Sequence, residues 1–219
     1  MDNFEILEQE IYNKLHKRAP GIDKLDRLWE AAVLLPLVNT EAGPSLLFEV
    51  RALRLNRQPG EICFPGGKYE CDDKDFSVTA IRETCEELGI NREDIKILGK
   101  LDCLVTHMGP IIHPFVGVLK DVSKIKYNSD EVEEVFTVPV RELLEQTPRQ
   151  AIMQLADKPA EDFPFDLVPD KKRGWRFHKE YNVYFYQYQH HVIWGLTARM
   201  LYAFLRRNRE ILQKMFKNS

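Results

Sequence analysis

Apolar residues recur at two different spacings along the chain, and these spacings predict its secondary structure. Near the N-terminus they recur every three or four positions, which predicts an amphipathic helix over residues 3–17, ended by Pro20 and Gly21. A second helical pattern over residues 193–215 predicts a long C-terminal amphipathic helix. That helix could pack against its own domain or against a second subunit, so a homodimer stays open. Between the two patterns lie short apolar runs bounded by turn residues, which are typical of strands.

The central part of the chain predicts strands around one helix. The apolar runs at 31–38 and 45–51 flank a turn signal at 41–44, so together they predict a hairpin. A helix is expected from about 75 to 88, where Gly89 stands at a typical C-terminal cap position. The other expected elements are strands at 95–105, 113–120, 132–138 and 181–188 and a short helix at 140–145.

Two segments that contain several prolines predict irregular structure. Residues 56–67 combine proline with glycine and predict a loop, interrupted by a short apolar stretch at 62–64. Residues 148–179 carry four prolines and mixed charge, which predicts long loops or an irregular insert. Strands and helices do not alternate regularly, which disfavours a doubly wound parallel sheet. The pattern favours a single mixed α/β domain over residues 1–219 with helices at both ends.

Composition and charge exclude several classes of protein. The 219 residues include 31 Lys and Arg and 34 Asp and Glu, and the net charge of −3 argues against nucleic acid as a partner. No apolar run is long enough to cross a bilayer, and the acidic N-terminus differs from a signal peptide, so we expect no membrane association. Four cysteines form no C-x-x-C pair, which indicates free thiols in a reducing cytoplasm.

Three glutamates crowd one side of the expected central helix. Glu83, Glu86 and Glu87 are spaced i, i+3, i+4, so their carboxylates repel one another, and the last turn of a helix disfavours negative charge. A hard divalent cation such as Mg²⁺ or Mn²⁺ would compensate, because these ions prefer oxygen ligands. A solvated acidic face is the plainer alternative. The opposite, apolar arc of this helix is expected to be its buried face and consists of Val78, Ile81, Cys85 and Leu88.

The residues before this helix favour the metal site over the solvated face. The segment Phe64–Gly67 is a glycine-rich loop, and glycines allow the backbone to approach a metal or a phosphate closely. Asp72 or Asp73 is near enough in sequence to orient Arg82 through a charge-assisted pair.

The stretch from Gly67 to Ile90 resembles the signature of the Nudix hydrolases. That pattern is G-x5-E-x7-R-E-U-x-E-E-x-G-U, where U is a bulky aliphatic residue. Thr84 replaces one aliphatic residue, and the distance from Gly67 to Arg82 is one residue longer than in the pattern, with Asp73 near the place of the first glutamate. The matching positions are Arg82, Glu83, Glu86, Glu87, Gly89 and Ile90.

The longer spacing and the preceding segment, residues 46–67, resemble the coenzyme A diphosphatase branch of that family. In this branch the segment typically reads L-L-T-x-R-S-x3-R-x3-G-x3-F-P-G-G. Asn56 replaces the second arginine, with Arg57 beside it. The two motifs cover residues 46–90, and weaker similarity predicts a core of about 29–145. The agreeing positions are Leu46, Leu47, Arg51, Gly60 and Phe64–Gly67.

The resemblance implies a fold and an activity. The fold would be a Nudix α/β/α sandwich around a mixed sheet, with residues 67–90 forming a loop–helix–loop metal site. The activity would be Mg²⁺- or Mn²⁺-dependent hydrolysis of coenzyme A or its thioesters to 3′,5′-ADP and 4′-phosphopantetheine. Two alternatives stay open: another nucleoside diphosphate derivative, such as ADP-ribose or a dinucleotide, and a Nudix module that senses nucleotides without catalysis.

The resemblance also implies roles for individual residues. Glu83, Glu86 and Glu87 would be the metal ligands, and Arg82 would hold Asp73 or orient Glu83 within the catalytic site. The remaining implied substrate contacts are the backbone of Gly66 and Gly67 and the side chains of Arg51 and Arg57.

The general base is left open by the sequence. The candidates are one of the signature glutamates, Glu131 or Glu134, although an exposed face of an edge strand is the simpler interpretation of the last two. His107 and His113 flank a loop that could reach the cleft, but a surface role is the simpler interpretation. The basic cluster Lys171–Arg176 could clamp an adenine and a phosphate, and a solvated loop tip is again the simpler interpretation.

Overall fold

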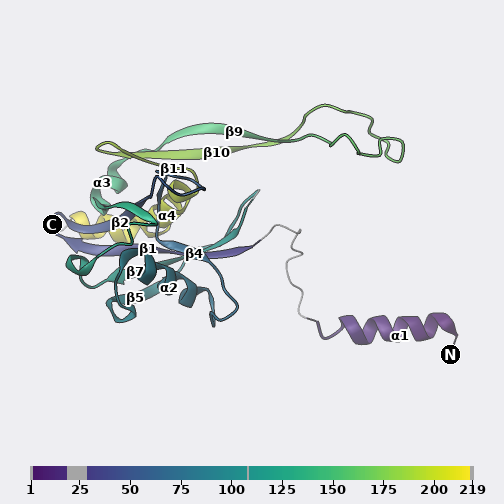
Figure 1. Ribbon diagram of the computed structural model, residues 1–219, viewed down its shortest axis with the longest axis horizontal. Coiled ribbons are helices and arrows are strands. Elements are labelled where there is room, and N and C mark those ends of the chain that lie inside the picture. Colours follow the sequence, from purple (N-terminus) through teal and green to yellow (C-terminus); the bar gives the residue numbers. More distant parts are fainter. Residues whose placement is uncertain (1, 19–28, 108, 218–219) are drawn as a thin grey trace.

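The computed structural model describes residues 2–18, 29–107 and 109–217, which form two sheets and four α-helices (Figure 1). The helices are α1 (Asn3–Leu15), α2 (Phe76–Leu88), α3 (Val140–Glu145) and α4 (Gly195–Lys217). The large sheet contains β1 (Glu30–Thr40), β2 (Gly43–Arg51), β3 (Ile62–Cys63), β4 (Gly66–Lys68), β5 (Ile95–Lys100), β6 (Leu104–Val105), β7 (Ile111–Leu119) and β8 (Val132–Pro139). The small sheet contains β9 (Arg149–Asp157), β10 (Arg176–Tyr188) and β11 (His191–Trp194).

The large sheet is mixed, as the sequence predicts. The expected hairpin is present, because β1 and β2 pair antiparallel with Leu37 opposite Leu46. On its other edge β1 runs parallel to β7, with Leu34 opposite Phe115. Strand β2 also pairs antiparallel with β8 along most of its length. A mixed sheet of this kind is neither a doubly wound parallel sheet nor a simple meander.

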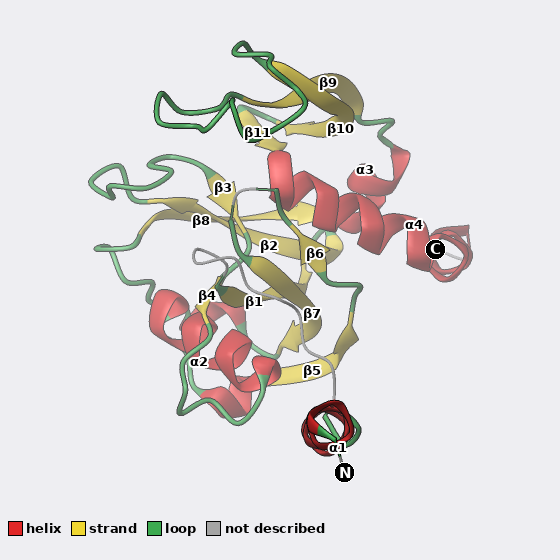
Figure 2. Ribbon diagram, turned by 90° about the vertical axis from the view of Figure 1, so that its right-hand side faces the viewer, coloured by secondary structure: helices red, strands yellow, loops and turns green. Residues whose placement is uncertain are grey.

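Helices cover both faces of the large sheet and bury two separate apolar cores. On one face α2 packs Ala80, Ile81 and Leu88 against strand residues that include Leu34. On the other face the core consists of alternate strand residues, including Leu35, together with α3 and α4. Neighbouring residues of a strand point to opposite faces, so the continuous apolar run of β1 serves both cores. Figure 2 shows α2 below the sheet and α4 above it, which confirms the α/β/α sandwich.

The C-terminal helix therefore packs on its own domain. Within α4, Leu201 is fully buried and Phe204 and Leu205 are nearly so, all in the core of the sheet's second face. Its apolar stripe was predicted from residue 193, but Ile193 belongs to β11 and α4 begins at Gly195. The positive φ of 65° at Gly195 marks the change from strand to helix.

The prediction of irregular loops over 148–179 was wrong at both ends. Residues 149–157 form β9, which pairs antiparallel with β10 from Phe185 back to Arg176. These strands and the loop between them form an arm that projects from the rest of the structure (Figure 1). Most of β9 is exposed on both faces, so its sequence carries no strict alternation of apolar and polar residues. The expected strand at 95–105 is also divided, into β5 and β6.

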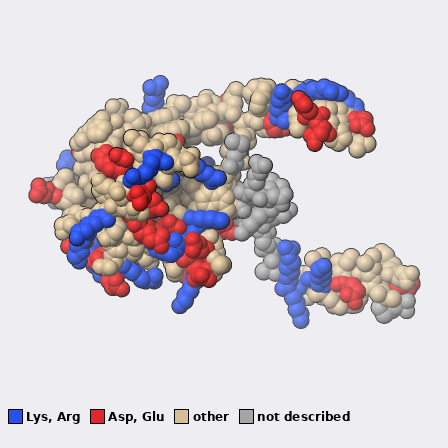
Figure 3. Space-filling model, viewed as in Figure 1, with Lys and Arg blue, Asp and Glu red and all other residues tan. Residues whose placement is uncertain are grey.

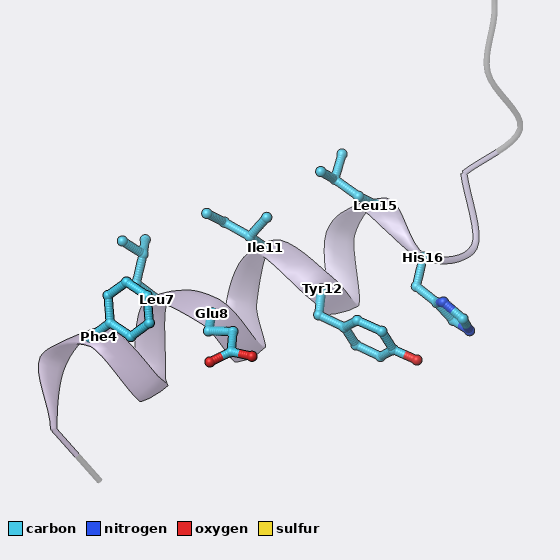
Figure 4. Close-up of a pocket in the computed structure, with 7 residues that line it drawn as sticks. All are labelled: Phe4, Leu7, Glu8, Ile11, Tyr12, Leu15 and His16. Atoms are coloured by element: carbon cyan, nitrogen blue, oxygen red, sulfur yellow. The ribbon is translucent and has the colours of Figure 1, made fainter.

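The N-terminal helix forms where its periodicity predicts, but no residue of it is buried. Asp2 caps α1 by accepting hydrogen bonds from the backbone N–H groups of Phe4 and Glu5, both at 2.8 Å. Figure 4 shows the apolar side chains extending outward from this helix along its length. The ring of Tyr12 stacks on that of His16. The helix ends at Leu15, and the predicted breakers at positions 20 and 21 lie outside the described residues.

Charge is spread over the visible face rather than sorted by sign. Figure 3 shows basic and acidic side chains mixed over the body and at the tip of the β9–β10 arm. In that tip Arg173 lies over the ring of Phe165, with 4.7 Å to the ring centroid, and Arg176 pairs with Asp170 at 3.6 Å. The predicted basic cluster is thus partly engaged within its own loop. No helix in the described part of the chain is long and apolar enough to cross a membrane.

Candidate active site

The chemistry predicted from the sequence centres on α2, whose two ends are fixed by local interactions. At its start the carboxylate of Asp75 accepts hydrogen bonds from the backbone N–H groups of Ser77 and Val78, at 2.8 and 3.2 Å. At its end Gly89 adopts a left-handed conformation with φ of 62°. A Cβ atom on Gly89 would lie 2.2 Å from the carbonyl oxygen of Lys126, so only glycine fits this cap.

Glu87 is buried, and this corrects the expected orientation of α2. Only 6% of Glu87 is exposed, whereas Cys85 and Val78, expected to be buried, are half-buried at the margin of the core. The backbone N–H of Gly66 donates a 2.8 Å hydrogen bond to Oε2 of Glu87. Burial raises the pKa of Glu87 well above its usual range, and the negative charge of Glu49 raises it further.

Glu83 lies half-buried against the glycine-rich loop. A Cβ atom on Gly67 would lie 2.4 Å from the carboxylate carbon of Glu83, so the absence of a side chain at Gly67 makes room for that carboxylate. Burial raises the pKa of Glu83, although the neighbouring guanidinium of Arg82, at 2.9 Å, lowers it. Glu86 is exposed and pairs with Arg82 at 3.3 Å. The three signature glutamates thus occupy three different environments.

Arg82 is held by Asp73, which confirms one of the two predicted partners. The guanidinium donates to both carboxylate oxygens of Asp73, at 3.3 and 3.2 Å, and to the carbonyl oxygen of Lys68 at 3.1 Å. Hydrogen bonds from Arg82 lower the pKa of Asp73 despite its burial, and the hydroxyl of Thr79 donates a further bond at 2.8 Å. Arg82 therefore joins the loop before α2 to the side of the helix that carries Glu83.

Glu49 is a further acidic residue of this region, which the sequence interpretation missed. It lies on β2, is 1% exposed, and accepts a 3.2 Å hydrogen bond on Oε1 from the thiol of Cys63. Its other oxygen, Oε2, is buried without a hydrogen-bond partner. Burial raises the pKa of Glu49 to about 7. A glutamate inside the apolar run Leu46–Val50 was the available signal, because charged residues are rarely buried without a partner.

The two candidate bases on and before β8 lie in different surroundings. Glu131 precedes β8, and its charge contributes to the raised pKa values of Glu49, Glu83 and Glu87. Glu134 instead lies beside His191, with 3.2 Å between Oε1 and Nε2. Only Glu131 is electrostatically coupled to the acidic group around α2.

The two histidines expected at the surface make contacts within the fold. His113 belongs to β7, where Nε2 lies 3.0 Å from the carboxylate of Glu30 and the ring stacks on Phe76 with 3.6 Å between centroids. The ring of His107 lies beside that of Tyr181, with 5.2 Å between centroids. His107 is exposed, as the surface interpretation predicts, whereas His113 is half-buried and packs within the fold.

The carboxylates of Glu49, Glu83 and Glu87 fit a hard divalent cation. Glu49 and Glu87 are buried and mutually repulsive, and Oε2 of Glu49 has no donor. Carboxylate oxygens are the ligands that Mg²⁺ and Mn²⁺ prefer, and a cation among them would relieve both the repulsion and the unsatisfied oxygen. The absence of a side chain at Gly67 leaves the space in which the carboxylate of Glu83 lies.

Comparison with known families agrees with this geometry. The family profile described as NUDIX domain matches residues 28–157. The chain belongs to the Nudix family. The match extends past the predicted core of 29–145 to the end of β9. Nudix hydrolases generally use divalent metals, and the acidic group around α2 of this Nudix hydrolase has the carboxylate ligands that such ions prefer.

The curated relatives of this Nudix hydrolase include proteins named for a substrate and proteins named only for the family. "Uncharacterized Nudix hydrolase NudL" of Photorhabdus laumondii is 33% identical over 172 residues, 78% of this chain and 81% of that protein. "Mitochondrial coenzyme A diphosphatase NUDT8" of Homo sapiens is 35% identical over 77% of this chain and 64% of its own length. "Peroxisomal coenzyme A diphosphatase NUDT7" of Mus musculus is 39% identical over 50% of this chain and 46% of its own length. A crystal structure of a C. elegans Ap4A hydrolase binary complex covers 51% of this chain and 81% of that chain, with 18% identity and a TM-score of 0.44.

The structure accommodates the departure of this Nudix hydrolase from the family signature at Thr84. The side chain is fully buried, and its hydroxyl donates a 2.6 Å hydrogen bond to the carbonyl oxygen of Ala80. That bond satisfies the hydroxyl within the helix, so a polar residue occupies an apolar position without an unpaired group.

The two arginines expected to contact phosphate are placed differently. Arg51 is half-buried, and its charge lowers the pKa of Glu49, which places Arg51 close to the acidic group. Its Nε donates a 3.4 Å hydrogen bond to the backbone carbonyl of Arg57. The side chain of Arg57 is exposed, and Arg54 is engaged by Asp130 at 3.4 Å.

Proposed function

We propose that this Nudix hydrolase cleaves the diphosphate bond of coenzyme A or its thioesters, giving 3′,5′-ADP and 4′-phosphopantetheine or its acyl form. Relatives from mouse and human carry the name coenzyme A diphosphatase. The observation that carries the proposal is the placement of residues 46–67, the segment that resembles this branch. They fold as β2, a loop and β3, and they bring Glu49 close enough to Glu87 for the two charges to interact, with Arg51 close to Glu49.

We propose Glu83, Glu87 and Glu49 as the side chains that hold Mg²⁺ or Mn²⁺, with Glu86 nearer to solvent. When bound, the ion neutralises diphosphate charge and lowers the pKa of a water. The backbone N–H of Gly66 keeps Glu87 in place, and Arg82 positions Glu83 through their 2.9 Å contact. Arg51 carries a positive charge next to this group and is the proposed contact for a phosphate of the substrate.

Glu131 is the proposed general base, in preference to Glu134. Its carboxylate is exposed to solvent and electrostatically coupled to all three proposed ligands. In the proposed reaction Glu131 takes a proton from the attacking water while the new O–P bond forms. The bridging P–O bond breaks at the same centre, and its oxygen leaves as part of the second phosphate.

We also propose that the protein is located in the cytoplasm. The structure places all four cysteines as free thiols, two of them exposed, and a reducing environment keeps such thiols unpaired. Fractionation of the source cells, with detection of the chain by an antibody, tests this location.

Product identification tests the proposed reaction. The full chain is incubated with Mg²⁺ or Mn²⁺ and, in parallel, with coenzyme A, an acyl-coenzyme A, ADP-ribose and a dinucleotide, and the products are identified by mass spectrometry. We expect 3′,5′-ADP and 4′-phosphopantetheine from coenzyme A at the highest kcat/KM of the panel. A higher kcat/KM for ADP-ribose or a dinucleotide overturns the substrate, and binding without turnover on any of them indicates a sensing module.

Binding of the ion itself tests the proposed ligands separately. Electron paramagnetic resonance of Mn²⁺ reports bound metal without reference to turnover. We expect Glu49→Gln to weaken Mn²⁺ binding at least tenfold. Glu61→Gln is the control, because Glu61 lies in the same motif but its carboxylate contacts Gln58, and this substitution should leave Mn²⁺ binding unchanged. Unchanged Mn²⁺ binding in Glu49→Gln overturns its place among the ligands.

A further inference from the structure

A second group of ligand-type side chains lies where the two sheets meet. Glu134 belongs to β8 of the large sheet, His191 is the first residue of β11 in the small sheet, and His190 precedes it in the turn after β10. One ligand atom of each lies within 4.8 Å of the other two. Over residues 2–18, 29–107 and 109–217, this is the one group of three His, Cys, Asp or Glu side chains that meets that spacing.

The spacing of these atoms matches that of ligands around a small divalent ion. Nε2 of His191 lies 3.2 and 3.3 Å from the two carboxylate oxygens of Glu134. Tetrahedral Zn²⁺, with bonds of about 2.0–2.2 Å to nitrogen and oxygen, separates its ligands by about 3.3–3.5 Å. The observed distances therefore need little adjustment when an ion binds between the two groups.

The local fold holds the two imidazoles in place. Gln189, with φ of 52°, turns the chain so that the rings of His190 and His191 come to 3.9 Å between centroids. The ring of His191 also stacks on Phe136 of β8, with 3.7 Å between centroids and an angle of 4°. The side chain at position 191 is thus fixed before any ion binds, which reduces the entropy lost on binding.

His191 also has an unsatisfied atom. The residue is 6% exposed, and its Nδ1 is buried without a hydrogen-bond partner. Buried polar atoms without a partner are rare and call for an explanation. The ring is held by stacking on Phe136, and Nε2 faces Glu134, so an ion at Nε2 leaves the ring proton on Nδ1 and breaks no second hydrogen bond of the ring.

This group is separate from the acidic group around α2. Glu134 is opposite Val50 on β2, and Glu49, the next residue along that strand, points to the other face of the sheet. His191 shares its face of β11 with Ile193, which is buried in the core beneath α4. Figure 2 shows the small sheet on the side of the large sheet away from α2.

We propose that Glu134, His190 and His191 form a second metal site, which binds Zn²⁺ or a similar borderline-soft ion. Two imidazoles and one carboxylate suit such an ion, whereas the all-carboxylate group around α2 suits Mg²⁺. His190 is exposed, so water completes the coordination. The bound ion joins β8 to the β10–β11 hairpin, with Nε2 of the neutral imidazole of His191 as its ligand and the ring proton on Nδ1.

Cobalt titration of the full chain tests the site, because Co²⁺ replaces Zn²⁺ and absorbs visible light strongly in four- or five-coordinate sites. Saturating Mg²⁺ is present to occupy the acidic group. We expect one equivalent of Co²⁺ to give these bands and one equivalent of Zn²⁺ to remove them. His190→Ala, at an exposed turn position, and Glu134→Gln should each lower the affinity on the order of 10–100-fold. His178→Ala, an exposed histidine on β10 that contacts Asp157, should leave it unchanged.

A second measurement follows the link between the two sheets. Zn²⁺ should raise the Tm of the wild type and of His178→Ala but not that of His190→Ala. Absence of the Co²⁺ bands in the wild type overturns the proposal, and so does their persistence in His190→Ala. Bands that are lost in Glu87→Gln and kept in His190→Ala place the ion in the acidic group and also overturn it.

Discussion

The backbone N–H of Gly66 donates a 2.8 Å hydrogen bond to the carboxylate of Glu87, a residue 21 positions further along the chain. The bond ties the first residue of β4 to the last turn of α2 and fixes one oxygen of a carboxylate that is 6% exposed. Nothing in helical periodicity requires this contact. It turns Glu87 from a residue on an acidic helix face into a buried carboxylate that a backbone N–H holds in place.

Removing the charge of Glu87 or of Glu83 should abolish most of the hydrolytic activity. In Glu87→Gln and Glu83→Gln one proposed metal ligand loses its charge while the shape of the side chain is kept. We expect kcat to fall at least 10²–10³-fold, the usual loss when one charge-stabilising group is removed from an active site. Steady-state kinetics with Mg²⁺ and coenzyme A measure the fall.

Glu86→Gln provides the matched comparison, because Glu86 is exposed and contacts Arg82. Its effect on kcat should be smaller than that of either other substitution. Circular dichroism should show that all three variants fold. Turnover that is unchanged in both Glu83→Gln and Glu87→Gln would locate the metal site elsewhere.

A side chain at position 67 should displace Glu83. In Gly67→Ala the added Cβ atom would lie 2.4 Å from the carboxylate carbon of Glu83, so the glutamate must move. We expect a clear loss of Mn²⁺ affinity but only a small loss of stability, because the atoms that the new Cβ would meet are the end of a flexible glutamate side chain. Denaturant unfolding and Mn²⁺ titration measure the two effects. Gly99→Ala is the control, because a Cβ atom there would meet no atom within 4 Å, and it should change neither quantity.

The pair formed by Arg82 and Asp73 should stabilise the fold in a pH-dependent manner. Hydrogen bonds from Arg82 lower the pKa of Asp73 below the value of 3.8 expected for the unfolded chain. The stabilisation is therefore present above pH 3.8 and is lost as the pH falls through the lower pKa of the folded state. Asp73→Asn should cost about 1.5–3 kcal/mol at neutral pH.

Unfolding by urea across a pH series measures this contribution. The difference between wild type and Asp73→Asn should shrink toward acid pH. Asp72→Asn is the control, because Asp72 is exposed and lies 3.8 Å from the thiol of Cys71. An equal effect of the two substitutions would contradict the assigned partner of Arg82.

Glu49→Gln should stabilise the metal-free protein at alkaline pH. Burial raises the pKa of Glu49 from 4.5 to about 7, so the folded state holds a proton that the unfolded state has released. Below pH 4.5 the carboxyl group of Glu49 is protonated in both states and does not lower the free energy of unfolding. As the pH rises from 4.5 to about 7, the unfolded state loses its proton first, and the free energy of unfolding falls. The substitution removes a cost of up to about 3 kcal/mol at pH 8 and little at pH 4.

Thermal denaturation in the presence of a chelator measures the gain. We expect the Tm of Glu49→Gln to exceed that of the wild type at pH 8 and to approach it at pH 4. Saturating Mn²⁺ should reverse the order at pH 8, because the wild type alone gains the full binding energy. A lower Tm of the variant at pH 8 without metal would show that the carboxylate is not a destabilising group.

Local patterns predicted the parts of the fold that depend on near neighbours. The helix expected at 75–88 is observed at Phe76–Leu88, because Asp75 and Gly89 supply caps that act within a few residues. Asp73 was one of two candidates for Arg82, and sequence distance did not distinguish it from Asp72. Burial did, because Asp73 lies inside with Thr79 as a second donor.

Other features depended on contacts that no local pattern records. A helical wheel groups side chains by angle, but it does not say which of them another element will cover. Strand β4, which begins at Gly66, covers Glu87, and Cys85 is left half-buried, so the buried face of α2 differs from the expected one. Strand β9 was missed for a related reason, since it lies in an exposed arm where no core imposes alternation.

The sequence by itself determined the identity of the reactive groups: the signature with Arg82, Glu83, Glu86 and Glu87, the glycines before it, and the balance of strands and helices around them. Only the tertiary structure decided which carboxylates share one environment. Glu49 and Glu87 come from a strand and a helix 38 positions apart, and packing the two elements on one face removes both from water. Desolvation and charge coupling depend on distance in space, so they follow from the packing of the sheet against α2 and from no pattern along the chain.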